Sequence, residues 1–208
     1  LGYADDTMNL QMERVDRAPE IHTSSFEDSG DFTYFNFSSG AVVTPEDPSA
    51  SAEWDLAVSG TRLRTNSGTS GPGMGGALLA DASALTEVLT APTGSGCYLI
   101  SRGHVCDCAL SDTECEESEG VWTPQCECEA PYVIDEVLDP EGSESYSGNP
   151  VLAQWSESAP GDEAPTPKAA AFIIRSAAGD TAKIQILDYS NGAMTISWTF
   201  AGPGKSSF

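Results

Sequence analysis

The sequence predicts an all-β protein with mostly antiparallel strands. Its last 40 residues hold three strand-like segments, at 169–176, 181–189 and 193–201. Short turn sequences join them, and the second, Ser190-Asn191-Gly192, contains the Asn-Gly pair that accepts positive φ at both positions of a tight hairpin turn. In the N-terminal half, aromatic and polar residues alternate over 31–37, which also indicates a strand. These segments predict a meander that closes on the aromatic strands of the N-terminal half.

An N-terminal arm is predicted at residues 1–31, which are polar and acidic, and the β domain at 32–208. One stretch of the arm alternates, so that Met8, Leu10 and Met12 would share one face of a strand. This pattern predicts self-association, in which the strand pairs with the sheet of a neighbouring molecule. The alternative is a frayed arm.

Short strands are predicted next at 31–37, 41–43, 54–58 and 61–65. In the last of these, Arg62 and Arg64 would point to one face of the sheet and Leu63 to the other. Two interpretations stay open for this arginine pair. The guanidinium groups could be solvated or paired with nearby acids, or they could clamp a ligand that carries a carboxylate, whose geometry arginine matches.

The segment 66–76 contains several glycines but lacks the Lys-Ser/Thr ending of a phosphate-binding loop, which argues against nucleotide binding. Residues 77–89 are rich in Ala and Leu and predict a short helix capped by Asp81 or Ser83. Further strands are predicted at 131–138 and 151–155, separated by polar loops.

All six cysteines lie in one acidic segment at 97–130, which predicts an irregular, disulfide-rich insertion with unknown pairing. A metal site is the alternative, but structural zinc sites usually space their cysteines by two to four residues rather than one, and flanking acids disfavour the thiolate. We therefore predict no metal. Disulfides imply an oxidising location, either extracellular or at the bacterial outer surface or periplasm. The cysteines are Cys97, Cys106, Cys108, Cys115, Cys126 and Cys128.

The formal net charge of −23 excludes a general nucleic-acid-binding protein, because phosphate binding depends on Lys and Arg. The longest uninterrupted apolar run, 169–174, is too short for a transmembrane segment. Leu1 does not begin a signal peptide, so the chain is interpreted as a processed or trimmed product. The acidic residues of 112–117 offer oxygen ligands to a cation, although a solvated acidic loop is the simpler interpretation. Two histidines in unrelated segments and no catalytic motif predict a protein that is not an enzyme.

The order of motifs resembles the HmuY family of bacterial haem-binding surface lipoproteins. The resemblance implies an all-β, single-domain fold, an outer-surface or secreted location, and haem capture between loops. It covers roughly residues 32–96 and 150–201. The motifs are YFNFSSGAVV at 34–43, WDLA at 54–57, RLRTNSGTSG at 62–71, GGA at 75–77, FIIR at 172–175, AKIQ at 182–185 and ISWTF at 196–200.

The resemblance also implies that two axial side chains, usually His and sometimes Met, hold the haem iron. They come from the middle of the chain and from the segment before the FIIR strand. Here the second segment, 155–168, contains neither His nor Met. The middle region offers His104, and the glycine-rich loop offers Met74. These two residues, with Arg62 and Arg64 for the haem carboxylates, are the predicted ligand-binding residues.

Two functions follow from these patterns. The first is a non-enzymatic secreted or cell-surface protein that binds haem, another porphyrin or a different small ligand. The alternative is a structural subunit of an extracellular assembly that has lost haem binding and pairs through its N-terminal strand.

Overall fold

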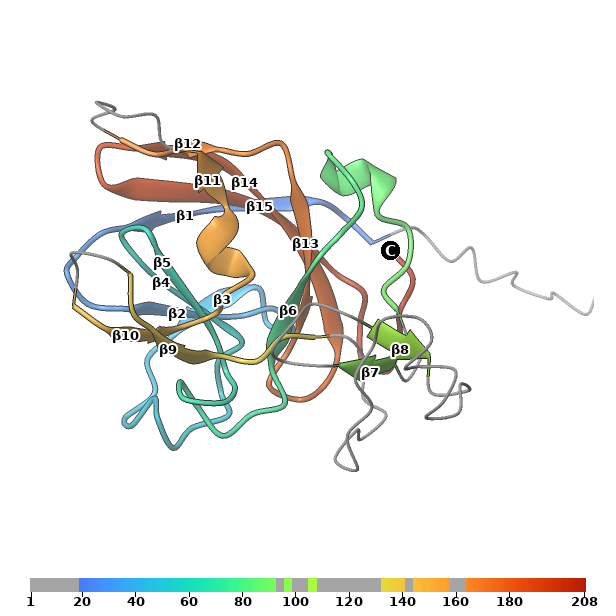
Figure 1. Cartoon of the computed structure of the whole chain (residues 1–208), viewed down its shortest axis with the longest axis horizontal. Coiled ribbons are helices and arrows are strands. Elements are labelled where there is room, and N and C mark those ends of the chain that lie inside the picture. The colour runs from blue at the N-terminus through green and yellow to red at the C-terminus, as the bar shows by residue number, and fades with distance from the viewer. Residues whose placement is uncertain (1–18, 93–95, 99–104, 108–131, 141–143, 158–163) are drawn as a thin grey trace, which may run out of the picture.

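The structure is a computed structural model that describes residues 19–92, 96–98, 105–107, 132–140, 144–157 and 164–208. Within these ranges, the regular elements are β-strands and two short 3-10 helices (Figure 1). All strand pairs are antiparallel, and most strands belong to a five-stranded and a four-stranded sheet. The predicted all-β class is therefore confirmed.

The five-stranded sheet has the order β1-β15-β14-β13-β6. Its centre is the predicted C-terminal meander. The turn between β14 and β15 has φ of 53° at Asn191 and 76° at Gly192, as the Asn-Gly sequence predicts. The strands are β1 (His22–Glu27), β6 (Gly76–Leu79), β13 (Ala171–Arg175), β14 (Thr181–Ser190) and β15 (Ala193–Phe200).

The four-stranded sheet has the order β3-β2-β4-β5 and consists of strands predicted from the N-terminal half. Its members are β2 (Thr33–Asn36), β3 (Ala41–Val43), β4 (Leu56–Ser59) and β5 (Arg62–Thr65). Three small hairpins complete the described strands. They are β7 (Gly96–Tyr98) with β8 (Val105–Asp107), β9 (Glu136–Leu138) with β10 (Tyr146–Gly148), and β11 (Ser156–Glu157) with β12 (Thr166–Pro167).

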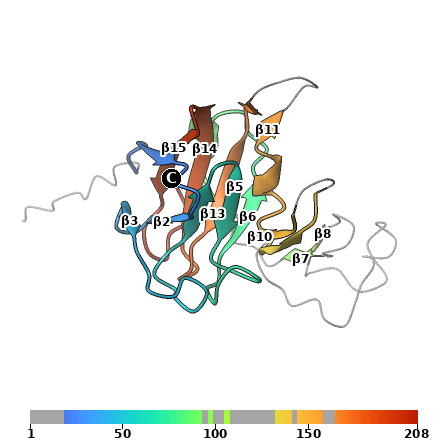
Figure 2. The same ribbon diagram turned by 90° about the vertical axis from the view of Figure 1, so that its left-hand side faces the viewer.

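The main core lies between the two large sheets, which overlap face to face in Figure 2. Phe35 of β2 lies at its centre, with its ring centroid 5.5 Å from that of Phe37 and 5.2 Å from that of Trp198 on β15. Burying each such side chain contributes roughly 1.5–3 kcal/mol. The alternation of Phe35 and Phe37 with Tyr34 and Asn36 therefore fixes which face of β2 turns inward.

The opposite face of the five-stranded sheet is covered by the segment that follows β6. Leu85 and Val88 pack there on Ile173, and Phe208 lies at the edge of this second core. Lys183 of β14 is buried beneath the segment and donates a hydrogen bond from Nζ to the Val88 carbonyl oxygen, at 2.7 Å. Burial lowers the pKa of Lys183 below its ordinary value.

Two buried polar residues, one in the WDLA motif and one in the RLRTNSGTSG motif, hold loops to the sheets through hydrogen bonds. Asp55 is 3% exposed, and its carboxylate accepts hydrogen bonds from the backbone N–H groups of Phe37 and Ala177, each at 2.8 Å. Asn66 is fully buried; its amide donates to the Ser51 and Trp54 carbonyl oxygens, and its Oδ1 accepts from the Gly73 N–H. The WDLA and RLRTNSGTSG motifs therefore have structural roles.

The glycine-rich loop wraps tightly around Asn66. A Cβ atom at Gly71 would lie 2.2 Å from Asn66 Oδ1, and one at Gly75 would lie 2.6 Å from the Asn66 carbonyl oxygen. These glycines permit a close approach of backbone to a buried side chain, as expected for glycine in such a loop.

A second buried carboxylate, Asp135, joins β5 to the loop before β9. It accepts hydrogen bonds from the Thr65 N–H and hydroxyl and, at 3.0 Å, from the Asn149 amide. Its own N–H donates to the Ser67 hydroxyl at 3.0 Å. Burial raises the pKa of Asp135, and burial likewise raises that of Asp55.

Two predicted elements were wrong. Residues 77–89 contain the end of β6 and only one 3-10 turn, η1 (Leu85–Glu87), because residues 77–79 pair with β13. Residues 151–155 contain the 3-10 turn η2 (Leu152–Gln154) rather than a strand. There the Asn149 side-chain oxygen accepts the N–H groups of Val151 and Leu152, which fixes a helical turn.

Part of the predicted N-terminal arm belongs to the sheet. Residues 22–27 form β1, which pairs with β15 along its whole length and places Phe26 in the main core. Met8, Leu10 and Met12 lie outside the described residues, as does most of the predicted insertion at 97–130.

Candidate functional site: the arginine face of the four-stranded sheet

The outer face of the four-stranded sheet carries the predicted arginine pair, and the register shows which residues lie beside each arginine in the sheet. Arg64 of β5 is opposite Ala57 of β4, which is in turn opposite Tyr34 of β2. Arg62 is opposite Ser59 in the same way. The guanidinium group of Arg64 lies over the ring of Phe32, just before β2, whereas that of Arg62 lies over the ring of Tyr146 on β10, which packs beside β5. We call this surface the arginine face: Phe32, Tyr34, Arg62, Arg64 and Tyr146.

Arg64 is held in one position by two contacts. Its guanidinium carbon lies 3.8 Å from the centroid of the Phe32 ring, and its Nε donates a hydrogen bond to the Ser147 carbonyl oxygen at 2.7 Å. The side chain is half-buried, and burial lowers its pKa. A cation stacked on a ring in this way contributes about 0.5–2 kcal/mol, depending on desolvation.

Arg62 is the more accessible of the two. It is exposed, and its guanidinium carbon lies 4.8 Å from the centroid of Tyr146 on β10. The sequence pattern left two interpretations, pairing with acids or a clamp for a carboxylate. The observed contacts are with aromatic rings and a carbonyl oxygen, so the hydrogen-bonding edge of Arg62 is oriented by stacking and lies at the surface, where it can meet a carboxylate.

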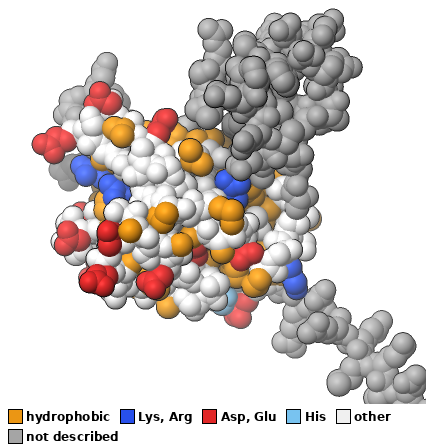
Figure 3. All heavy atoms as spheres, turned by 90° about the horizontal axis from the view of Figure 1, so that it is seen from below, with side chains coloured by type: hydrophobic (Ala, Val, Ile, Leu, Met, Phe, Trp, Pro, Cys, Tyr) orange, Lys and Arg blue, Asp and Glu red, His pale blue; other side chains and the backbone are white. Residues whose placement is uncertain are grey.

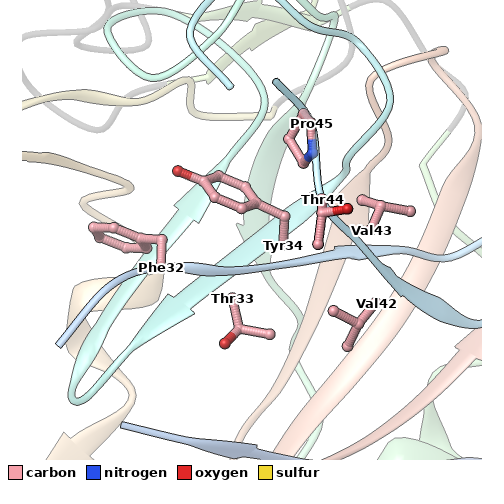
Figure 4. A pocket seen from close by; sticks show the side chains of 7 residues that line it. All are labelled: Phe32, Thr33, Tyr34, Val42, Val43, Thr44 and Pro45. Carbon is pink, nitrogen blue, oxygen red and sulfur yellow. The ribbon is translucent and has the colours of Figure 1, made fainter. Parts of the chain in front are cut away.

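A shallow hollow of about 270 Å³ adjoins the arginine face. Figure 4 shows Phe32 and Tyr34 beside it, on the same side of β2, so the hollow and the arginine face share two rings. Its volume lies just below the range of roughly 300–1,000 Å³ typical of small-molecule sites. The lining residues are Phe32, Thr33, Tyr34, Val42, Val43, Thr44 and Pro45.

Sequence reasoning identified the two arginines but missed the rings that orient them. Phe32 and Tyr34 alternate with Phe35 and Phe37 on a predicted strand, so their shared outward face was a usable signal. Tyr146 had no such signal, because it reaches Arg62 only when the β9–β10 hairpin packs beside β5.

Met74, the other predicted ligand residue within the described part of the chain, lies in the glycine-rich loop. Met74 is 56% exposed and lies against Gly179 at the turn between β13 and β14. The Met74 N–H donates a hydrogen bond to the Ala177 carbonyl oxygen. The Ala177 N–H in turn donates to the carboxylate of Asp55, the residue just before β4. Arg62 pairs with Ser59, the last residue of β4, so Met74 and Arg62 lie toward opposite ends of that strand. His104 lies outside the described residues.

His22, the other histidine, stacks on Trp198 with the ring centroids 4.6 Å apart, on β1 and the neighbouring β15. Within the described part of the chain, no group of three or more His, Cys, Asp and Glu side chains is arranged to hold a metal ion. No helix of the described residues is long and apolar enough to span a membrane.

Surface charge differs across the molecule. On the face shown in Figure 3, most acidic side chains gather at one end, while the hydrophobic side chains are scattered rather than joined into one broad patch. The arginines at 62 and 64 are two of only nine basic residues in a chain with 32 acidic ones. Positive charge on the arginine face is therefore a local feature of a strongly acidic protein.

A family model described as HmuY protein matches residues 28–200, which is most of the chain. Solved structures share the fold. An apo HmuY analog from Tannerella forsythia has a TM-score of 0.55 at 16% identity, covering 89% of this chain and 98% of its own. Apo PinO from a Porphyromonas species has a TM-score of 0.53 at 15% identity, and the match covers 87% of this chain and 97% of that one. A Bacteroides fragilis protein named as a lipoprotein has a TM-score of 0.51 at 17% identity, and the match covers 89% of this chain and 91% of that one. No curated protein matches the chain.

Proposed function

The chain belongs to the HmuY family, and on that premise we propose that it is a non-enzymatic secreted or cell-surface protein that binds haem, another porphyrin or a similar flat, carboxylate-bearing ligand. The family match over residues 28–200 is the observation that carries this proposal. The relative from Bacteroides fragilis that is named as a lipoprotein supports the surface location.

The arginine face supports the part of the proposal that concerns ligand chemistry. Arg62 offers an accessible guanidinium, Phe32 and Tyr34 offer flat apolar rings, and the adjoining hollow offers a concave surface. A porphyrin combines a flat apolar ring with carboxylates, and arginine binds carboxylates through two parallel hydrogen bonds. These residues fit the periphery of such a ligand.

The described residues do not supply a pair of axial ligands for the iron of haem. Iron in haem proteins is held by groups such as His or Met aimed at the metal. Of the His and Met residues at described positions, His22 stacks on Trp198 and Met74 lies over Gly179. His104 lies outside the described residues and stays a prediction as an axial ligand of the iron. Binding of the porphyrin ring and ligation of the iron are therefore separate questions for experiment.

A titration of the full chain with haemin tests the proposal. We expect a shifted Soret band that saturates at a fixed stoichiometry. Parallel titration with metal-free protoporphyrin, followed by fluorescence, separates ring binding from iron ligation. If His104 is an axial ligand, the H104A variant should lose the shift of the Soret band but keep the binding of metal-free protoporphyrin. If neither porphyrin gives a saturable signal, porphyrin binding is wrong.

The arginines can be tested in the same titrations. The double variant R62A/R64A should weaken porphyrin binding by roughly tenfold or more, because about 1.5–3 kcal/mol is typical of hydrogen bonds to charged groups. The control is K205A, which removes one exposed positive charge in the loop that follows β15 of the five-stranded sheet. Equal weakening in the double variant and the control would indicate a general charge effect instead of a site.

A second candidate function is the structural subunit, and the position of β1 favours it. Within the described residues, β1 is an edge strand that pairs only with β15. A free edge can accept a strand from another molecule. Deletion of residues 1–18, which leaves β1 intact, should then abolish self-association in light scattering. A full-length chain that is already monomeric would contradict this function.

A further inference from the structure

Two of the six cysteines lie in described strands, and the register places them opposite each other. β7 (Gly96–Tyr98) and β8 (Val105–Asp107) form an antiparallel pair in which Cys97 is the direct partner of Cys106. The neighbouring partners are Gly96 with Asp107 and Tyr98 with Val105. The sequence by itself left all 15 pairings of six cysteines open.

Directly opposite residues of an antiparallel pair have Cα atoms about 4.5 or 5.5 Å apart, depending on the hydrogen-bonding pattern. Both spacings lie within the roughly 4.4–6.8 Å range found between the Cα atoms of disulfide-bonded cysteines. The other four cysteines lie outside the described residues. The backbone register therefore brings Cys97 and Cys106 within the range that a disulfide can span.

We propose that Cys97 and Cys106 form a disulfide that closes the β7–β8 hairpin. In this step the two thiols lose two protons and two electrons, an S–S bond forms, and a disulfide oxidant such as oxidised glutathione is reduced to two thiols. The bond would close a loop that contains His104, the histidine predicted from the resemblance as an axial ligand. It also leaves four cysteines, for which only three pairings remain.

The sequence allows a direct test by peptide mapping. Arg102 is the only tryptic site between the two cysteines, and a protease that cleaves before Asp separates Cys106 from Asp107. Full-length protein, oxidised in a glutathione buffer and alkylated at acidic pH to stop exchange, is digested with both enzymes without reduction. We expect peptide 81–102 to be linked to peptide 103–106, with the two masses separating after reduction.

Other products of the same digest would overturn the proposal. Peptide 81–102 linked to 107–111 would assign Cys97 to Cys108, and linkage to 112–134 would assign it to one of the later cysteines. An alkylated, unlinked Cys97 would show that it is a free thiol. C108S is the matched control: it removes the cysteine next to the proposed pair and should leave the 81–102 to 103–106 linkage at its wild-type yield, and loss of that linkage would also contradict the assignment.

Discussion

The two faces of the four-stranded sheet are made by alternate residues of the same strands, yet they have different tasks. On β5, Leu63 is buried in the main core while Arg62 and Arg64 lie on the outer face. On β2 and just after it, Phe35 and Phe37 pack on Trp198, while Tyr34 packs on Trp54. The inner face holds the two sheets together. The outer face presents oriented charge and rings, so its residues can change with less cost to the fold.

The largest expected effect tests the inner face. Phe35→Ala removes the ring at the centre of the main core and should lower the free energy of unfolding by about 3–5 kcal/mol. Urea denaturation followed by Trp fluorescence measures this loss. A decrease below 1 kcal/mol would show that the two sheets do not depend on this contact, and the comparison between the faces would fail.

The next effect concerns Asp55, which links the sheets through two backbone N–H groups. In Asp55→Asn an NH2 group replaces one carboxylate oxygen, and this group cannot accept a hydrogen bond. The N–H of either Phe37 or Ala177 therefore stays buried without a partner. The expected loss is about 1–3 kcal/mol, the usual cost of an unsatisfied buried group. The same urea experiment measures it, with Asp47→Asn at an exposed loop as the control. Equal effects of the two variants would contradict the linking role.

The two arginines sharpen the comparison within the outer face. Arg64 stacks on Phe32 and binds the Ser147 carbonyl oxygen, so Arg64→Ala should cost about 1–2 kcal/mol of stability. Arg62 is exposed, and Arg62→Ala should cost about 0.5 kcal/mol or less. Thermal unfolding of both variants measures the difference. If Arg62 proved the more important for stability, its proposed role in ligand binding would lose its basis.

The smallest effect is a pH dependence at Asp135. Because burial raises its pKa in the folded state, the folded chain binds a proton more readily than the unfolded chain. The stability that Asp135 contributes is then full below the unfolded pKa and is lost as the pH rises through the folded value. Between pH 4 and pH 7 the wild-type free energy of unfolding should therefore fall more steeply than that of Asp135→Asn. Parallel slopes would show that this carboxyl does not titrate differently on folding.

Much of the fold followed from local sequence. The strand alternation of 31–37 and 61–65 and the Asn191-Gly192 turn predicted the correct strands because each signal depends on near neighbours. The failures had two causes. Residues 77–79 became β6 because β13 was available as a partner, which no local pattern reveals. The turn at 152–154 had a readable signal in Asn149-Pro150, since Asn caps a helical turn and Pro suits its first position.

The candidate site was only half predictable. Arg62 and Arg64 were identified because alternation in a strand needs no tertiary information. Met74 was proposed with them from the resemblance, and in the structure it lies over Gly179 because the glycine-rich loop is bound to Asn66 and Ala177. Tyr146 joined the arginine face through packing of a hairpin that starts 70 residues or more after β5.

By itself, the sequence determined the β class, the inward and outward residues of β2 and β5, and the acidic character of the surface, because these depend on composition and on a period of two residues. Only the tertiary structure decided which strands became neighbours, that Asp55 and Asp135 are buried and which backbone groups they bind, and that Cys97 and Cys106 are register partners. Such contacts join residues far apart in the chain, and their energies exist only once the sheets have assembled.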